Sequence, residues 1–207
     1  MEKKAKEIRQ LIEKQEMPEE LKIEVLESYH ILGSEEINEK GVSEDALNIW
    51  KNSKEPIFVS VRSSATTEDL ADASFAGQQE SFLNIKGDSE LIEHIKKCFA
   101  SLYTARAIYY RHKKGFSEEQ ALIAVVIQKM VDSEKSGVVF SKNPTNLEEE
   151  VVIEAVFGLG EGVVSGKIKP DYYVVTGTAE DLKVKDIKIS DKKIAIVRKS
   201  SGENEIV

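Results

Sequence analysis

The hydrophobic positions at the start of the chain repeat with helical spacing. Residues 2–15 carry their few apolar side chains on one helical stripe. After a break at Pro18, apolar side chains recur every three or four residues from Leu21 to Leu32, and Gly33 follows as a stop signal. These spacings predict a pair of amphipathic helices.

From residue 56 onward, short runs of branched and aromatic residues replace that pattern. Each run is bounded by glycine, asparagine, proline or charged residues, as strands usually are. The predicted strands are 57–61, 81–85, 123–130, 137–141, 151–156, 171–176, 182–189 and 193–198, with helices expected at 43–51 and, as one continuous element, at 89–114. The pattern therefore predicts an α+β fold, and no period of 20–50 residues indicates a repeat protein.

The first predicted strand leads into an unusually polar stretch. The apolar run stops at Arg62, hydroxyl and acidic side chains continue to Ser74, and Gly77 and Gln78 follow. An arginine fork together with glycine amides can hold the oxygens of a phosphate. From the residues alone, the alternative is a solvated surface loop whose serines cap a helix, and composition favours this alternative over a phosphate site.

Four blocks of sequence resemble one family. The blocks are VRSSATTEDLADASFAGQQESFLNI, ARAIYYRHKKGF, IAVVIQKMVDSEKSGVVFSKNP and VVIEAVFGLGEGVVSGKIKPDYYVV, and together they cover roughly residues 56–177. They are similar to the N-terminal nucleotide-binding domain of the phosphoenolpyruvate synthase family. That domain is an ATP-grasp unit shared with pyruvate phosphate dikinase and rifampicin phosphotransferase. The glycine cluster GLGEG and the absence of GxxxxGK[ST] would not by themselves indicate a nucleotide site.

The resemblance assigns roles to particular residues. Arg62 stands where the family holds the ATP phosphates, and Glu161 stands at the phosphate end of the cleft; these are the two candidate catalytic residues. The cofactor-binding candidates besides Arg62 are Gly77, Gln78 and Ser81 of the lid loop, and Gln128, Lys129, Met130 and Val131 of the linker whose backbone reads adenine. Ser81 replaces the family's usual threonine and keeps the hydroxyl. For Glu161, an ion pair with Lys167 or Lys169 is an equally open interpretation.

The resemblance also implies an incomplete ATP-grasp domain. We expect residues 1–55 to be a helical segment of the N-terminal lobe. Residues 56–207 would form the nucleotide-binding region, with a hinge near 128–131 and a second lobe at 132–207. The family's N-terminal lysine, and the late acid and amide that hold Mg²⁺, have no counterpart here. We therefore expect no metal ligands in this chain and no activity of the chain in isolation.

The parent reaction implied by the resemblance is the conversion of pyruvate to phosphoenolpyruvate. ATP would be the phosphoryl donor, with AMP and phosphate released, and a phosphohistidine in another domain would carry the group. The expected partners are therefore an adenine nucleotide and the phosphohistidine and pyruvate-binding domains of the parent enzyme. A rifampicin-phosphotransferase-like dikinase and a truncated, inactive module remain alternatives.

Composition restricts these functions further. The 207 residues carry a net charge of −8, which argues against a nucleic-acid partner. No apolar run approaches the ~20 residues of a membrane span, and no signal-peptide pattern opens the sequence. The single Cys98 suits a reducing cytoplasm, and its position on an apolar stripe predicts a buried, unreactive thiol.

Overall fold

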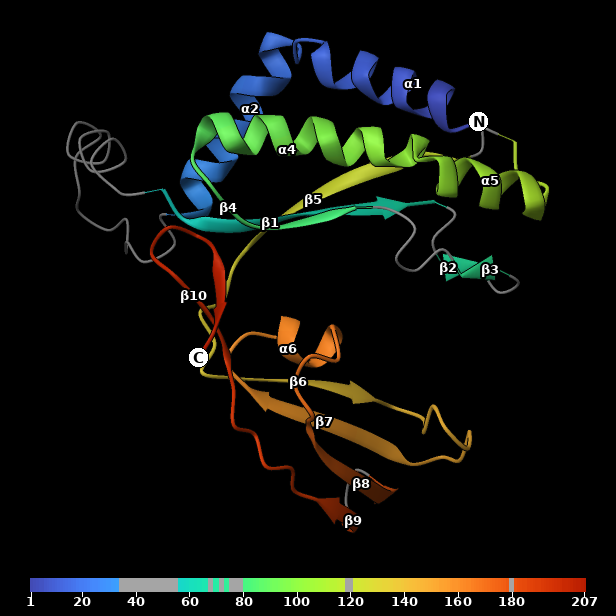
Figure 1. Ribbon diagram of the computed structural model, residues 1–207, viewed down its shortest axis with the longest axis vertical. Helices are drawn as coiled ribbons and strands as arrows, with labels where there is room; N and C mark the ends of the chain where they lie inside the picture. Colours follow the sequence, from blue (N-terminus) through green and yellow to red (C-terminus); the bar gives the residue numbers. More distant parts are fainter. Residues whose placement is uncertain (34–55, 67–68, 71–72, 75–79, 118–120, 179–180) are drawn as a thin grey trace. The chain divides into compact units, whose positions relative to one another are not determined.

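The computed structural model describes residues 1–33, 56–66, 69–70, 73–74, 80–117, 121–178 and 181–207 (Figure 1). The chain divides into two compact units, unit 1 (Met1–Met130) and unit 2 (Val131–Val207). The helix expected at 43–51 and the lid residues Gly77 and Gln78 lie outside the described residues. Within the described ranges, no helix combines the length and apolar character that crossing a membrane requires.

The helices of unit 1 begin and end close to where the sequence signals them. Helix α1 (Glu2–Lys14) and helix α2 (Glu19–Leu32) flank the proline, and α1 packs against α4 (Asp88–Ala100). Lys96 of α4 donates hydrogen bonds to the main-chain oxygens of Glu13 and Gln15, at 2.8 and 3.3 Å. These bonds satisfy carbonyl groups that the end of α1 would otherwise leave without partners.

The prediction of one continuous helix over residues 89–114 is wrong. The segment forms α4, a 3-10 turn at Ser101–Tyr103, and then a separate helix α5 (Ala105–Lys114). Thr104 causes the break, because it adopts an extended conformation and its side chain accepts the N–H of Ala107 at 3.1 Å. Apolar periodicity continues across this junction, and only the threonine cap signals a new helix start.

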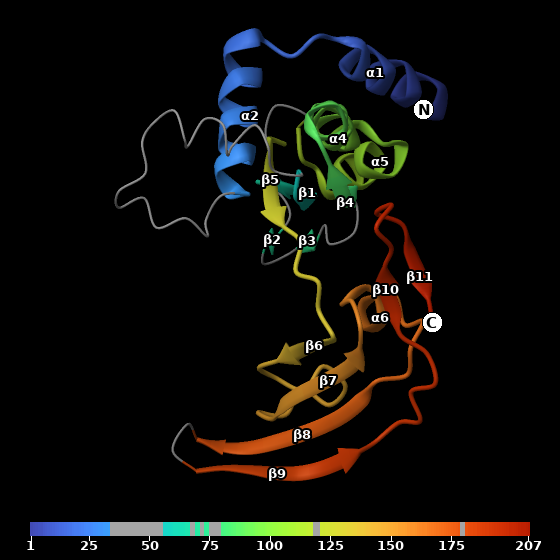
Figure 2. The ribbon, with the colours of Figure 1, turned by 90° about the vertical axis from the view of Figure 1, so that its left-hand side faces the viewer.

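A three-stranded antiparallel sheet supports the helices of unit 1. Strand β1 (Phe58–Ala65) lies between β4 (Ser81–Lys86) and β5 (Ile123–Lys129). A two-residue pair, β2 (Asp69–Leu70) with β3 (Ala73–Ser74), follows β1. Val59 and Val61 of β1 are buried in a core shared with α4, and Figure 2 shows the helix next to the strand. Cys98 is part of this core as expected, and burial raises the pKa of its thiol to about 11.

Strand β4 contains a bulge that keeps its apolar residues on the core side. Val61 pairs with Phe82, whereas Val59 pairs with Ile85, so one extra residue of β4 stands opposite Ser60. Asn84 takes up the extra length in the left-handed conformation, with φ of 58°. Asparagine tolerates that conformation better than most residues.

Unit 2 is built on a four-stranded antiparallel sheet. Its strands β6 (Lys135–Phe140), β7 (Val151–Phe157), β8 (Asp171–Thr178) and β9 (Asp181–Lys188) pair in chain order. The expected strand at 193–198 is shorter, β10 (Ile196–Arg198), and it pairs with β11 (Asn204–Ile206) rather than with β9. The helices and antiparallel sheets of both units confirm the α+β class.

Candidate functional site

Arg62 lies inside β1 and not at its exit, which corrects the expectation from the sequence. Strand β1 continues to Ala65, and the residues after Arg62 remain paired with β5 as far as Ala65 with Ile123. The serines that resemble a polar loop are therefore strand residues. Ser64 lies on the face of the sheet away from the core, where a polar residue is expected, whereas Ser63 lies on the same side as Val59 and Val61.

The sheet register gathers several of the predicted residues on that face. Arg62 stands directly opposite Ser81 of β4 on one side and Val126 of β5 on the other. Gln128 is two residues farther along β5, and its side-chain oxygen accepts a hydrogen bond from Arg62 Nη1 at 3.3 Å. Arg62, Ser81 and Gln128 thus come together although they are far apart in the sequence.

This open face of the unit 1 sheet is accessible over its central part. Arg62, Ser81, Ala124, Val126 and Gln128 are all exposed, and the helices described for unit 1 pack on the other face. Val126 is 47% exposed beside the arginine. An exposed apolar residue next to a guanidinium and a hydroxyl gives the face both apolar and hydrogen-bonding character.

The predicted hinge residues differ in which backbone groups they leave available. Met130 donates its N–H to the carbonyl of Phe58 at 2.9 Å, and Thr66 donates to the carbonyl of Leu122 at 2.9 Å. Hydrogen-bonded pairs alternate in an antiparallel ladder, so Gln128 also pairs with β1 while Lys129 turns its N–H and C=O outward. Of the four hinge candidates, Lys129 therefore presents backbone groups at the sheet edge. Val131 begins unit 2 and is 74% exposed.

Glu161 lies in unit 2 at the first turn of the short helix α6 (Glu161–Val164). Its carboxylate accepts hydrogen bonds from Lys167 Nζ at 2.7 Å and Asn204 Nδ2 at 2.6 Å. These two bonds lower the pKa of the Glu161 carboxyl below its ordinary value, and the bond from Lys167 has the larger effect. The ion pair with Lys167, one of the two interpretations left open by the sequence, is present.

The backbone that positions Glu161 depends on a close approach at Gly158. Leu159 donates its N–H to the carbonyl of Ile196 at 2.8 Å, and Gly158 donates to that of Glu134 at 2.8 Å. Gly158 has φ of 79°, and a Cβ there would lie 2.2 Å from the Ile196 oxygen. The first glycine of the GLGEG sequence is thus required by packing, independently of any ligand.

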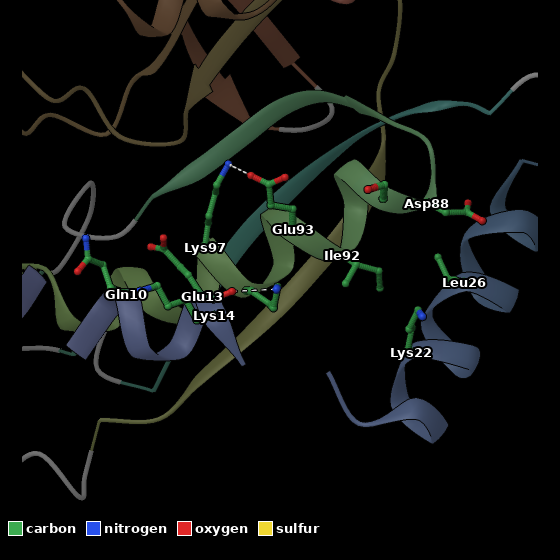
Figure 3. A pocket seen from close by; sticks show the side chains of 11 residues that line it. Gln10, Glu13, Lys14, Lys22, Leu26, Asp88, Ile92, Glu93 and Lys97 are labelled. Atoms are coloured by element: carbon green, nitrogen blue, oxygen red, sulfur yellow. Dashed lines mark hydrogen bonds and ion pairs between the residues drawn. The ribbon is translucent and has the colours of Figure 1, made fainter. Parts of the chain in front are cut away.

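A groove on the helical side of unit 1 is separate from these residues. It has a volume of about 760 Å³ and lies between α1, α2 and α4 (Figure 3). Its charged side chains include both signs, and Lys97 pairs with Glu93 at 2.5 Å across one of its walls. No residue predicted from the sequence lines this groove, because α4 lies on the face of the sheet opposite Arg62.

The acidic and histidine side chains of the chain are the candidate ligands for a metal ion. In the part of the chain that the structure describes, no three or more His, Cys, Asp or Glu side chains lie close enough together to hold a metal ion. Glu161 is already engaged by Lys167 and Asn204.

Sequence reasoning missed two features of the candidate site. Asn204, which holds Glu161, lies 43 residues farther along the chain, and no motif indicates it. Val126 could have been found, because the alternation within IAVVIQ places it on the same face as Gln128. Residues 123–127 are all apolar, however, and such a run predicts a strand that is buried on both faces.

Comparison with known proteins gives matches over the whole chain. The family model described as the pyruvate phosphate dikinase AMP/ATP-binding domain matches residues 1–207. A "Probable phosphoenolpyruvate synthase" of Archaeoglobus fulgidus is 56% identical over 143 residues, which are 69% of this chain and 19% of that protein. A protein of the same description from Methanocaldococcus jannaschii is 44% identical over 98% of this chain and 16% of its own length.

A relative from Pyrococcus furiosus, described as "Phosphoenolpyruvate synthase", is 44% identical over 193 residues. Those residues are 92% of this chain and 21% of the Pyrococcus protein. The chain thus spans about a fifth of the length of the relatives that it matches.

Proposed function

The chain belongs to the pyruvate phosphate dikinase AMP/ATP-binding domain family, and on this basis we propose that the open face of the unit 1 sheet binds the phosphates of ATP. The observation that carries the proposal is the register that sets Arg62 opposite Ser81 and within hydrogen-bond distance of Gln128. A guanidinium offers paired donors to phosphate oxygens, and the serine hydroxyl adds one more. The described residues thus fit an anionic ligand at this place.

The bond between Arg62 and Gln128 suits a site that exchanges partners. At 3.3 Å it is longer than a typical hydrogen bond, and both side chains are exposed. Releasing the neutral amide in favour of a charged oxygen therefore costs little and gains a stronger, charge-assisted bond. In this proposal Gln128 keeps the guanidinium extended over the sheet until the nucleotide binds.

In this proposal the adenine ring hydrogen-bonds to the backbone at the end of β5. Lys129 is the hinge candidate whose N–H and C=O point away from β1, and this pair of groups matches the donor and acceptor on one edge of adenine. The side chains of the hinge then matter less than its backbone. The division of the chain after Met130 is compatible with the proposed hinge at 128–131.

For the whole enzyme we propose ATP-dependent formation of phosphoenolpyruvate from pyruvate, with release of AMP and phosphate. The phosphohistidine and the pyruvate site would belong to other domains, since this chain corresponds to about a fifth of its relatives. Mg²⁺, when bound, would neutralise phosphate charge, and its ligands are assigned outside this chain. A cytoplasmic enzyme of pyruvate metabolism and gluconeogenesis is the corresponding cellular role.

A nitrogen-15 NMR titration of the chain with a non-hydrolysable ATP analogue tests the site. The proposal expects shifts at the Arg62 side chain and at the amides of Ser81 and Lys129, with a dissociation constant weaker than about 0.1 mM, or ~5.5 kcal/mol. Weak binding follows because the triphosphate meets a chain of net charge −8. Shifts confined to the groove between α1, α2 and α4 would overturn the assignment.

A further inference from the structure

The outer edge of β5 is not paired with any other described strand. Among the described strands the order is β4, β1, β5, so none of them pairs with the far side of β5. The ladder with β1 uses the main-chain groups of alternate residues and directs those of Ile123, Val125 and Ile127 outward. Three consecutive outward positions form a regular template for another strand.

The usual protections of a sheet edge are missing along this segment. Residues 123–127 read IAVVI and include no lysine, proline or glycine. The register with β1 runs without a bulge from Val59 with Lys129 to Ala65 with Ile123. Natural edge strands normally carry charges, prolines or bulges that prevent further pairing. A flat apolar edge is therefore expected to be covered in the working protein.

An apolar groove lies beside one end of this edge, at Ile127. It has a volume of about 380 Å³ and is lined mainly by apolar residues of α2 together with Ile127 of β5. Leu21, Val25, Tyr29 and Leu32 of α2 contribute to it, and Leu21 is still 43% exposed. Figure 2 shows α2 beside β5, at the end of the sheet away from β4. Helix α2 thus extends past the last described strand.

We propose that β5 pairs with a further β-strand, supplied by polypeptide outside the 207 residues, whose alternate apolar side chains fill the groove beneath α2. An extended occupant follows from the outward main-chain groups, which a helix could not use. Alternation follows because one side of such a strand would meet α2 while the other would continue the open face beside Val126. The edge of β5 therefore requires a partner strand in which apolar residues occupy every second position.

The relatives of this chain are several times longer than the segment that it matches, and their additional polypeptide is a source for the strand. In the Pyrococcus furiosus protein the matched residues are 21% of the length, so most of that polypeptide lies outside the matched segment. A second copy of this chain fits the edge less well. Pairing β5 with β5 about a two-fold axis would bring two α2 helices into the same space over the seam. The proposed strand covers residues 123–127 and does not depend on nucleotide binding near Lys129.

Hydrogen exchange measured residue by residue tests this proposal. In the isolated chain, the outward amides of Val125 and Ile127 should exchange on the order of 100-fold faster than the inward amides of Val126 and Gln128. In the full-length Pyrococcus furiosus relative, the amides aligned with Val125 and Ile127 should be as protected as their inward neighbours. This difference between the two proteins is the expected result.

Any other pattern of amide exchange would overturn the proposal. Protection of the outward amides in the isolated monomer would mean that the 207 residues cover their own edge. Rapid exchange in the full-length relative would mean that nothing pairs there. Protection that appears only as the isolated chain dimerises would identify a second copy as the partner.

A pair of proline variants provides an independent readout. In the isolated chain, Val125→Pro removes an outward N–H and should lower the melting temperature no more than Val125→Ala does. Val126→Pro removes an N–H bonded to β1 and should prevent cooperative unfolding. In the full-length relative, both aligned prolines should be disruptive. Equal effects of the two prolines in the isolated chain would count against a free edge.

Discussion

Arg62 and Ser81 are directly opposed across β1 and β4, so a guanidinium and a hydroxyl stand on one face of the sheet although 19 positions separate them in sequence. Their juxtaposition is fixed by main-chain pairing and does not require either side chain to bond the other. A ligand that accepts hydrogen bonds from both would therefore meet donors whose backbones are already ordered.

Replacing Arg62 tests the main donor. Arg62→Ala should weaken binding of an ATP analogue about 10- to 100-fold, since a hydrogen bond to a charged group contributes about 1.5–3 kcal/mol. Arg62→Lys should recover only part of this, because an ammonium lacks the planar fork. Titration calorimetry measures both. Arg106→Ala, at an exposed position of α5, is the matched control, and an equal loss there would point to general electrostatics.

Ser81 supplies a smaller contribution. Ser81→Ala should weaken nucleotide binding by about 3- to 10-fold, the value of one hydrogen bond, while Ser81→Thr keeps the hydroxyl and should bind normally. The same titration measures both variants. Equal weakening by alanine and threonine would show that the space at β4 matters rather than the hydroxyl.

Gly158 should be intolerant of any side chain. Gly158→Ala places a Cβ 2.2 Å from the Ile196 oxygen at a φ of 79°, and we expect a loss of at least ~2 kcal/mol in the free energy of unfolding. Gly166→Ala shares a positive φ, 67°, but its Cβ would meet nothing within 4 Å. Chemical denaturation of both variants separates the steric cost from the backbone cost. Similar losses would contradict a specific contact with Ile196.

The pair formed by Glu161 and Lys167 predicts a pH dependence. The pKa of Glu161 is lowered from its ordinary value of 4.5, so its ionised form stabilises the fold above that pH. This stability is lost as the pH falls through the lower pKa of the folded state. Glu161→Gln should therefore melt below the unaltered chain at pH 7, and the difference should shrink at pH values under 4.5. A difference that is constant down to pH 3 would exclude ionisation as the cause.

No histidine of this chain should carry a phosphoryl group. His30 pairs with Asp88 at 2.9 Å, and His94 Nδ1 lies 2.7 Å from the main-chain oxygen of Glu90. His112 is exposed near the end of α5. Incubation of the isolated chain with ATP and Mg²⁺ should give neither phosphohistidine by mass spectrometry nor released phosphate. Stoichiometric labelling of any one of the three would assign it the role proposed for another domain.

The sequence predicted most elements because their signals are local. Pro18 and Gly33 mark the ends of α2, and the IAVVIQ run marks β5. The break at Thr104 was missed because an N-cap hydrogen bond leaves the apolar period undisturbed. The extension of β1 past Arg62 was missed because Ser63 stands at the inward position where an apolar residue would have continued the alternation of Val59 and Val61.

The arrangement of the candidate site depended on information that is not local. That Arg62 faces Ser81 rather than Phe82 is set by the register of β1 with β4, which includes a bulge at Asn84. A shift of one residue would have put Ser81 on the core side. The resemblance named the residues, but only strand pairing indicates which of their side chains can act together.

The two sheets differ in how far apart in sequence their paired strands lie. In unit 2 every strand of the larger sheet pairs with its neighbour in the chain, whereas Val59 pairs with Lys129 across 70 positions in unit 1. Closing so long a loop costs entropy before the pairing stabilises anything. The meander of unit 2 should therefore form early during folding, and the β1–β5 ladder that carries Arg62 and Gln128 should be a late, rate-limiting event.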